Sequence, residues 1–113
     1  MTVLVLGGAG YVGSHAVSTL IEQGYDVAVV DNLVTGHREA VPNTVRFYKG
    51  DVRDKLFLDT VFTLERKIEG VMHFCAYSLV GESMQHPTMY FDNNVGGCIT
   101  ILEAMTKYDV KHI

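Results

Sequence analysis

The fold of this chain is decided by the stretch Val3-Leu4-Val5-Leu6-Gly7-Gly8-Ala9-Gly10-Tyr11-Val12-Gly13. Its apolar beginning predicts a buried strand, and three spaced glycines follow at once. Gly7 permits a tight turn, Gly10 lets the backbone approach a pyrophosphate, and Gly13 lets the next helix pack closely on the strand. The helix N-terminus would then point its free N–H groups and positive dipole end at the phosphates. The stretch therefore predicts a strand, a phosphate-binding loop and a helix.

The residues that follow agree with a dinucleotide-binding unit. Residues 14–23 carry apolar side chains at helical spacing, and Gly24 is typical of a helix end. Residues 25–30 predict a second buried strand, after which Asp31 stands at the strand's carboxyl end. Strand, glycine loop, helix and strand in this order are specific for nucleotide binding in a way that spaced glycines alone are not.

Asp31 indicates which dinucleotide is bound. It lies 18 residues after Gly13, close to where this kind of fold places the carboxylate that accepts hydrogen bonds from the adenosine ribose hydroxyls. A carboxylate there repels a 2′-phosphate, and Asn32 and Leu33 offer no compensating cation. The sequence therefore favours NAD over NADP.

Composition limits the chain to one domain and excludes several classes of function. With 113 residues, 48% of them hydrophobic and 19% charged, there is room for one compact core, so residues 1–113 are expected to form a single domain. A formal net charge of −4 without a basic cluster argues against a nucleic-acid partner. Cys75 and Cys98 fit free thiols in a reducing compartment, and no apolar run is long enough for a membrane span. We expect a cytoplasmic protein.

The rest of the chain predicts further alternating elements. In order, the pattern predicts a loop with one helical turn at 32–43, a strand at 45–50, a helix at 56–67, a strand at 71–76, a loop at 77–83, a helix at 88–108 and the start of a strand at 110–113. Right-handed crossovers then give a Rossmann-type, doubly wound parallel sheet in the order 3-2-1-4. We expect this α/β sheet to be truncated, with an exposed strand edge that promotes homodimerisation or other self-association.

Some residues allow two interpretations. Asp51 can cap the following helix or meet an adenine ring, and spacing favours the cap. His73 lies in a strand that is expected to be fully buried, which favours a core histidine over a ligand or base. Asp59 and Glu65 are expected to face solvent.

Several segments together resemble the amino-terminal part of the UDP-glucose 4-epimerase family, within the extended short-chain dehydrogenase/reductases. The resemblance covers the whole chain and is carried by Gly7-Gly8-Ala9-Gly10-Tyr11-Val12-Gly13-Ser14-His15, Asp31-Asn32-Leu33, Gly50-Asp51-Val52-Arg53-Asp54, His73-Phe74-Cys75-Ala76, Val80-Gly81-Glu82-Ser83 and Tyr90-Phe91-Asp92-Asn93-Asn94-Val95. Two positions differ from the usual pattern. Leu6 stands where many relatives have Thr, and Ser78 where some have Lys, which puts one cation-to-ribose contact in doubt.

The resemblance implies a cofactor site that runs along the chain. Tyr11 and Val12 would lie against the pyrophosphate, residues 31–36 around the adenosine ribose, Asp51 and Val52 at the adenine, and residues 74–78 along the nicotinamide half. The cofactor-binding residues that we expect are Gly7, Gly10, Tyr11, Val12, Gly13, Asp31, Asn32, Leu33, Thr35, Gly36, Asp51, Val52, Phe74, Cys75, Ala76, Ser78 and Asn93.

The family's reaction interconverts UDP-glucose and UDP-galactose, in galactose metabolism, through a 4-keto intermediate formed by hydride transfer to NAD. Its base is a Tyr with a Lys four residues on. None of the six tyrosines of this chain has that partner. We therefore expect a fragment that holds NAD, lacks the catalytic pair and the UDP-sugar site, and is inactive alone.

Other functions stay open at this point. Another nucleotide-sugar enzyme of the same family, such as a dehydratase or a decarboxylase, would share this half. A non-catalytic dinucleotide-binding module would explain the missing Tyr and Lys. The histidines and cysteines show no metal-ligand spacing, and no serine stands in a nucleophile-elbow context.

Overall fold

The computed structural model describes residues 2–33, 37–65, 67–74, 96–110 and 112–113. Four parallel strands form one sheet in the order β3-β2-β1-β4, as the sequence predicts. They are β1 (Thr2–Leu6), β2 (Asp26–Asp31), β3 (Arg46–Lys49) and β4 (Ile68–His73). The helices are α1 (Tyr11–Glu22), the 3₁₀ helix η1 (Arg38–Ala40), α2 (Lys55–Leu64) and α5 (Gly97–Lys107).

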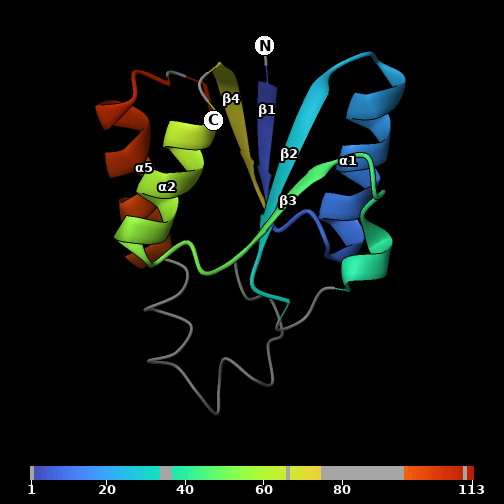
Figure 1. The fold of residues 1–113 in the computed structure, drawn as a ribbon, viewed down its shortest axis with the longest axis horizontal. Coiled ribbons are helices and arrows are strands. Elements are labelled where there is room, and N and C mark those ends of the chain that lie inside the picture. The colour runs from blue at the N-terminus through green and yellow to red at the C-terminus, as the bar shows by residue number, and fades with distance from the viewer. Residues whose placement is uncertain (1, 34–36, 66, 75–95, 111) are drawn as a thin grey trace.

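The sheet is covered on both faces, which confirms the doubly wound architecture. Figure 1 shows α1 on one side of the sheet and α2 with α5 on the other. Because side chains alternate along a strand, Val3 and Val5 of β1 pack toward α1, while Leu4 and Leu6 pack toward α2 and α5. β1 lies between β2 and β4, with Leu4 opposite Ala28, and all of β1 is buried.

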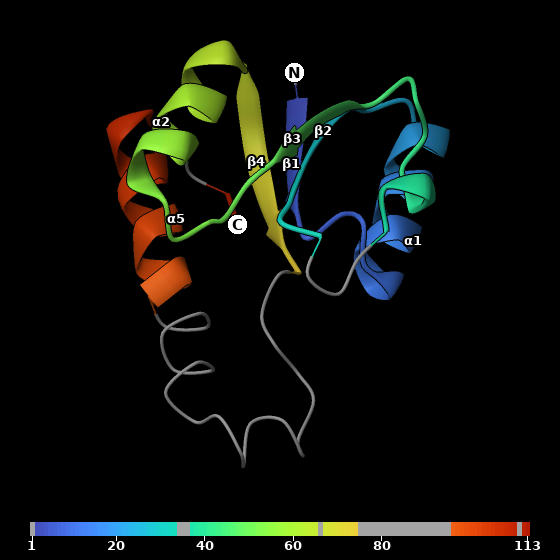
Figure 2. The same cartoon turned by 60° about the horizontal axis from the view of Figure 1, so that its bottom comes forward.

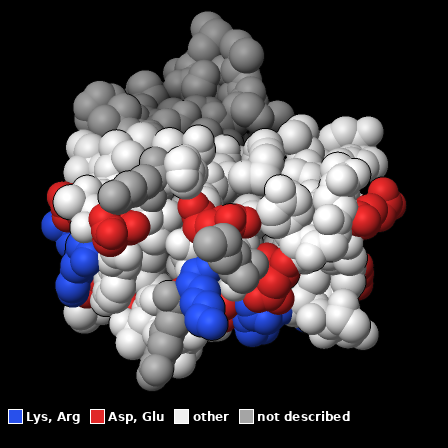
Figure 3. Space-filling model, turned by 90° about the horizontal axis from the view of Figure 1, so that it is seen from above, with Lys and Arg blue, Asp and Glu red and all other residues white. Residues whose placement is uncertain are grey.

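All the strands point the same way, so the sheet has two distinct ends. The glycine loop, the start of α1 and the end of β2 meet at the carboxyl end, which comes forward in Figure 2. At the opposite, amino end of the sheet, acidic and basic side chains lie beside one another (Figure 3). A ligand site built from the glycine loop must therefore lie at the carboxyl end, as in other doubly wound sheets.

Three predictions about residues 51–76 are wrong in detail. Asp54, not Asp51, caps α2, because its carboxylate accepts a hydrogen bond from the Phe57 N–H at 3.2 Å. Glu65, expected at the surface, is only 6% exposed, because it follows the last turn of α2 and turns inward to Arg46. β4 is not fully buried. Val71 alone of its residues is buried, because β4 forms an edge of the described sheet.

The ends of some elements also differ from prediction. α1 begins at Tyr11, before the expected residue 14, and β4 begins at Ile68 rather than residue 71. Residues 88–95 of the predicted long helix lie outside the described residues, and so do residues 75–76 of the predicted strand. Of the strand predicted at 110–113, residue 111 lies outside the described residues and the other three are not assigned as strand. The Val71 N–H nevertheless donates to the His112 carbonyl at 2.9 Å.

Candidate functional site

The loop of residues 7–10 carries the chain from β1 into α1. Gly7 has a φ of 84°, and its N–H donates to the Val30 carbonyl at 2.7 Å, so the turn is tied to β2. A Cβ placed on Gly13 would lie 2.1 Å from the Gly7 carbonyl oxygen. The tight turn and the close helix packing predicted for these two glycines are therefore confirmed.

Gly8 is a further glycine position, and it is absent from the predicted site residues. A Cβ there would lie 2.7 Å from a methyl group of Val29, so the loop packs directly on β2. The adjacent glycines at 7 and 8 are the only sequence signal for this close approach. The absence of a side chain at Gly8 therefore allows the loop to lie close to β2.

Gly10 and the first turn of α1 leave open space on the other side of the loop. A Cβ on Gly10 would meet nothing nearer than the Gly7 carbonyl oxygen, at 3.5 Å. No side chain caps α1, and its first turn holds no acidic residue. Tyr11 and Val12 are 83% and 61% exposed at this end. The geometry provides backbone N–H donors and a positive dipole end to an anion, as the phosphate-binding prediction requires.

Asp31 lies beside this loop, at the end of β2. Its side chain accepts hydrogen bonds from two backbone N–H groups, that of Ala9 at 3.0 Å and that of Leu33 at 2.8 Å. Leu33 has a φ of 63°, so the chain turns sharply around the carboxylate. The structure thus brings Asp31 next to the glycine loop, 8% exposed, where the sequence places it.

Asp51 follows β3 at the same end of the sheet. Its carboxylate accepts from the Arg53 N–H at 2.9 Å and from the Arg53 guanidinium at 2.6 and 3.0 Å. The Arg53 guanidinium, with a smaller contribution from the Asn32 side chain, holds the pKa of Asp51 below its usual range. The interaction between Asn32 and Asp51 joins the ends of β2 and β3. One residue predicted at the ribose and one predicted at the adenine therefore meet here.

Val52 is placed by packing in the core, and Phe74 by a backbone hydrogen bond to β1. Val52 is buried in the core on the α2 and α5 side and lies against Gly97, where a Cβ would come within 2.9 Å of its methyl group. Its side chain therefore faces the core, and only its backbone is left for the predicted adenine contact. Phe74 continues the pairing with β1, since its N–H donates to the Leu6 carbonyl at 2.7 Å.

His73 lies at the end of β4, half-buried, and its burial lowers its pKa, so the neutral imidazole is favoured. This agrees with a structural histidine. Within the described ranges, no three His, Cys, Asp or Glu side chains gather as metal ligands would. The predicted site residues Thr35, Gly36, Cys75, Ala76, Ser78 and Asn93 lie outside the described residues.

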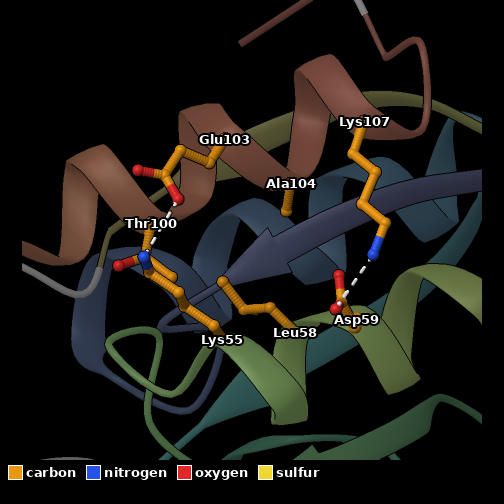
Figure 4. Close-up of a pocket in the computed structure, with 7 residues that line it drawn as sticks. All are labelled: Lys55, Leu58, Asp59, Thr100, Glu103, Ala104 and Lys107. Carbon is orange, nitrogen blue, oxygen red and sulfur yellow. Dashed lines mark hydrogen bonds and ion pairs between the residues drawn. The ribbon is translucent and has the colours of Figure 1, made fainter.

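A second hollow lies between α2 and α5, across the sheet from α1 (Figure 4). It has a volume of about 200 Å³ and is flanked by two ion pairs, Lys55 with Glu103 at 3.3 Å and Lys107 with Asp59 at 3.1 Å. Each charge already has a partner of opposite sign. The two ion pairs therefore connect α2 and α5, and we do not regard the hollow as a ligand site.

The described helices give no sign of a membrane segment, because none is both long enough and apolar enough to cross a bilayer.

Comparison with solved structures places this geometry among known enzymes. One UDP-glucose 4-epimerase crystal structure superposes with a TM-score of 0.95 and 53% identity, over 98% of this chain and 33% of the other. The Thermus thermophilus UDP-glucose 4-epimerase complex with NAD gives a TM-score of 0.94 and 43% identity, over 98% of this chain and 35% of the other.

Sequence comparison agrees with this. The chain is 58% identical over 113 residues to the UDP-glucose 4-epimerase of Lacticaseibacillus casei, covering 100% of this chain and 34% of the relative. For the enzyme of Streptococcus mutans the identity is 54% over 114 residues, with the same coverage. The chain spans about a third of the length of these relatives. Residues 3–113 also match the model of one protein family. By this match, the chain belongs to the NAD dependent epimerase/dehydratase family.

Proposed function

We propose that this chain is the NAD-binding part of a UDP-glucose 4-epimerase, a cytoplasmic enzyme of galactose metabolism. The observation that carries the proposal is the 58% identity along the whole chain to the UDP-glucose 4-epimerase of Lacticaseibacillus casei. The glycine loop and Asp31 of this chain agree with it. The NAD complex of the Thermus thermophilus relative supports the choice of cofactor.

The residues of the carboxyl end fit an NAD molecule. The open face of Gly10 and the first turn of α1 would hold the pyrophosphate, since they offer N–H donors without a side chain in the way. Asp31 would accept hydrogen bonds from the ribose hydroxyls, using the carboxylate lone pairs that the N–H groups of Ala9 and Leu33 do not occupy. Bound NAD would supply the hydride acceptor for oxidation at C4 of the sugar.

The proposal assigns cofactor binding, not proton transfer, to these 113 residues. No tyrosine of the chain is followed by lysine at the family's spacing. In a natural chain that ended at Ile113, the same observation would favour the second candidate, a non-catalytic dinucleotide-binding module. A downstream Tyr-x-x-x-Lys in the gene would support the enzyme. A stop codon directly after Ile113 would support the module.

Substituting Gly10→Ala tests the cofactor site directly. The backbone there has a φ of −80°, and a methyl group would meet no protein atom nearer than 3.5 Å, so the fold should remain. The same methyl group would occupy the space proposed for the pyrophosphate. We expect NAD affinity, measured by calorimetric titration, to fall about tenfold or more.

Gly70→Ala is the matched control, because a Cβ there also meets nothing nearer than 3.5 Å and lies in β4 near the amino end of the sheet. It should leave NAD affinity unchanged. Equal NAD affinity in Gly10→Ala and the wild type would contradict the proposed site. Tighter binding of NADP than of NAD would contradict the role of Asp31.

The predicted self-association also remains a proposal, with a second copy of this chain as the partner. β4 is a half-buried edge strand of the described sheet, and a hollow of about 360 Å³ lies over it on the α1 side. Its lining includes Leu20, Met72 and the exposed Ile113. Burial of this apolar surface would favour a dimer. Sedimentation velocity at micromolar concentration tests it, and a single monomeric species would contradict it.

A further inference from the structure

The peptide groups on either side of Ala9, in the middle of the glycine loop, are held by the last residue of β2 and by the segment that follows it. The Ala9 N–H donates to the Asp31 carboxylate at 3.0 Å. The Ala9 carbonyl accepts from the His37 N–H at 3.0 Å. Ala9 itself is 2% exposed. The loop is therefore anchored by residues far from it in sequence.

A second hydrogen bond holds the Asp31 carboxylate in place. Its other carboxylate oxygen accepts from the Leu33 N–H at 2.8 Å, and Leu33 adopts a φ of 63°. A leucine in this left-handed conformation is disfavoured and persists only when its surroundings hold it there. The carboxylate thus links the glycine loop to the turn after β2.

We propose that Asp31 is a positioning residue for the pyrophosphate loop, in addition to its predicted contact with the ribose. By fixing the N–H of Ala9, the carboxylate sets the direction of the backbone at Gly10 and hence of the first turn of α1. The inference rests on the proposed function, since the loop is taken as the NAD pyrophosphate site. It predicts that Asp31 affects ligands that have no ribose hydroxyls.

The alternative is that Asp31 acts on the ribose alone. The two roles separate with 2′,3′-dideoxy-ADP, which keeps the diphosphate and lacks both hydroxyls. If Asp31 contacts only the ribose, the wild-type chain and Asp31→Asn should bind dideoxy-ADP with equal affinity. If Asp31 positions the loop, Asp31→Asn should weaken the binding of dideoxy-ADP too. Asparagine has only one side-chain oxygen, so it can accept from the N–H of Ala9 or of Leu33, and its NH₂ group would face the other N–H without a hydrogen bond.

The experiment is calorimetric titration of the wild-type chain and Asp31→Asn with ADP and with 2′,3′-dideoxy-ADP. We expect the substitution to weaken dideoxy-ADP about tenfold, as for one lost charge-assisted hydrogen bond, and to weaken ADP further. Asp54→Asn is the matched control. It removes the same charge from an exposed carboxylate while asparagine still caps α2, and it should change neither affinity. Equal dideoxy-ADP affinity in Asp31→Asn and the wild type would overturn the proposal.

Amide hydrogen exchange of the unliganded wild-type chain gives a second reading that needs no variant. The Ala9 N–H should exchange slowly, because it is bonded to Asp31, while the N–H groups of Tyr11 and Val12 should exchange fast until NAD is added. An Ala9 N–H as fast as that of Tyr11 would overturn the proposal even if Asp31→Asn fails to fold. Slow Ala9 exchange without any NAD binding would leave Asp31 as the loop anchor and contradict only the proposed function.

Discussion

The two ends of the parallel sheet use their polar groups in opposite ways. At the amino end, the Arg46 guanidinium donates to Glu65 at 2.7 to 2.9 Å and to Asp26 at 2.6 and 3.1 Å. Tyr48 donates to Glu65 at 2.5 Å, and Thr2 donates to Asp26 at 2.7 Å. These side chains join the starts of β1, β2 and β3 to the end of α2. The charged and polar side chains named here are therefore bonded to one another.

At the carboxyl end, the donors in the first turn of α1 are left open. The first turn of α1 has no side-chain cap, and the surface of Gly10 is open. Asp31 is bonded to backbone N–H groups but has lone pairs left. The side-chain network that joins the strands and the proposed NAD site thus lie at opposite ends of the sheet.

Ionisation at the amino end follows from the same contacts. Burial alone would raise the pKa of Glu65, but the hydrogen bonds from Arg46 and Tyr48 outweigh it and hold the pKa below its usual range. The Arg46 guanidinium likewise lowers the pKa of Asp26. Burial, followed by the bond to Glu65, raises the pKa of Tyr48 to about 12. The network is thus charged at neutral pH.

The largest effect on stability is expected from Arg46→Met. It leaves the buried Glu65 carboxylate without its cation, and we expect the free energy of unfolding to fall by about 2 to 3 kcal/mol, below the full value for a buried pair because Asp26 and Arg46 are partly exposed. Urea unfolding measures this. NAD affinity at a temperature where the variant is folded should not change.

Lys107→Ala is the comparison for that variant, because it breaks an ion pair at 3.1 Å that is open to solvent. Its unfolding midpoint in urea should stay close to that of the wild type. If Arg46→Met were as stable as Lys107→Ala, the amino end would not hold the sheet together. If it lost NAD affinity while folded, the two ends would not be independent.

A smaller effect is expected from acid. The pKa values of Glu65 and Asp26 are lower in the folded chain than their ordinary values of 4.5 and 3.8, so the unfolded chain binds more protons as the pH falls through this range. The stabilisation is complete above those ordinary values and is lost as the pH falls through the lower folded ones. Urea unfolding midpoints between pH 6 and pH 3 should therefore decrease.

The effect is smaller than that of Arg46→Met because a protonated Glu65 is neutral and can keep a hydrogen bond, whereas an unpaired buried carboxylate is charged. Glu65→Gln removes one of the two titrating groups, so its unfolding midpoint should depend less on pH than that of the wild type. An unchanged slope in Glu65→Gln would show that other carboxylates cause the acid sensitivity.

Most of the fold could be predicted from local patterns. The strand and glycine loop at residues 3–13, the helix end at Gly24 and the strand ending at Asp31 appear as expected, because burial and backbone conformation there depend on neighbours in sequence. The errors fall where distant residues decide. Glu65 is buried because Arg46 and Tyr48 reach it from β3, and no helical periodicity contains that information.

Spacing along the chain was enough to determine the glycine loop, the acidic residue at the end of β2 and the alternation of strands and helices that leads to the sheet order. Spacing is local, so these features are present in the sequence before the chain folds. Packing decided that Asp31 bonds to Ala9, that Asp54 rather than Asp51 caps α2, and that the charges of the amino end form one network. Each of these depends on which of several chemically suitable partners comes within about 3 Å once the chain is packed, and packing is a property of the whole fold.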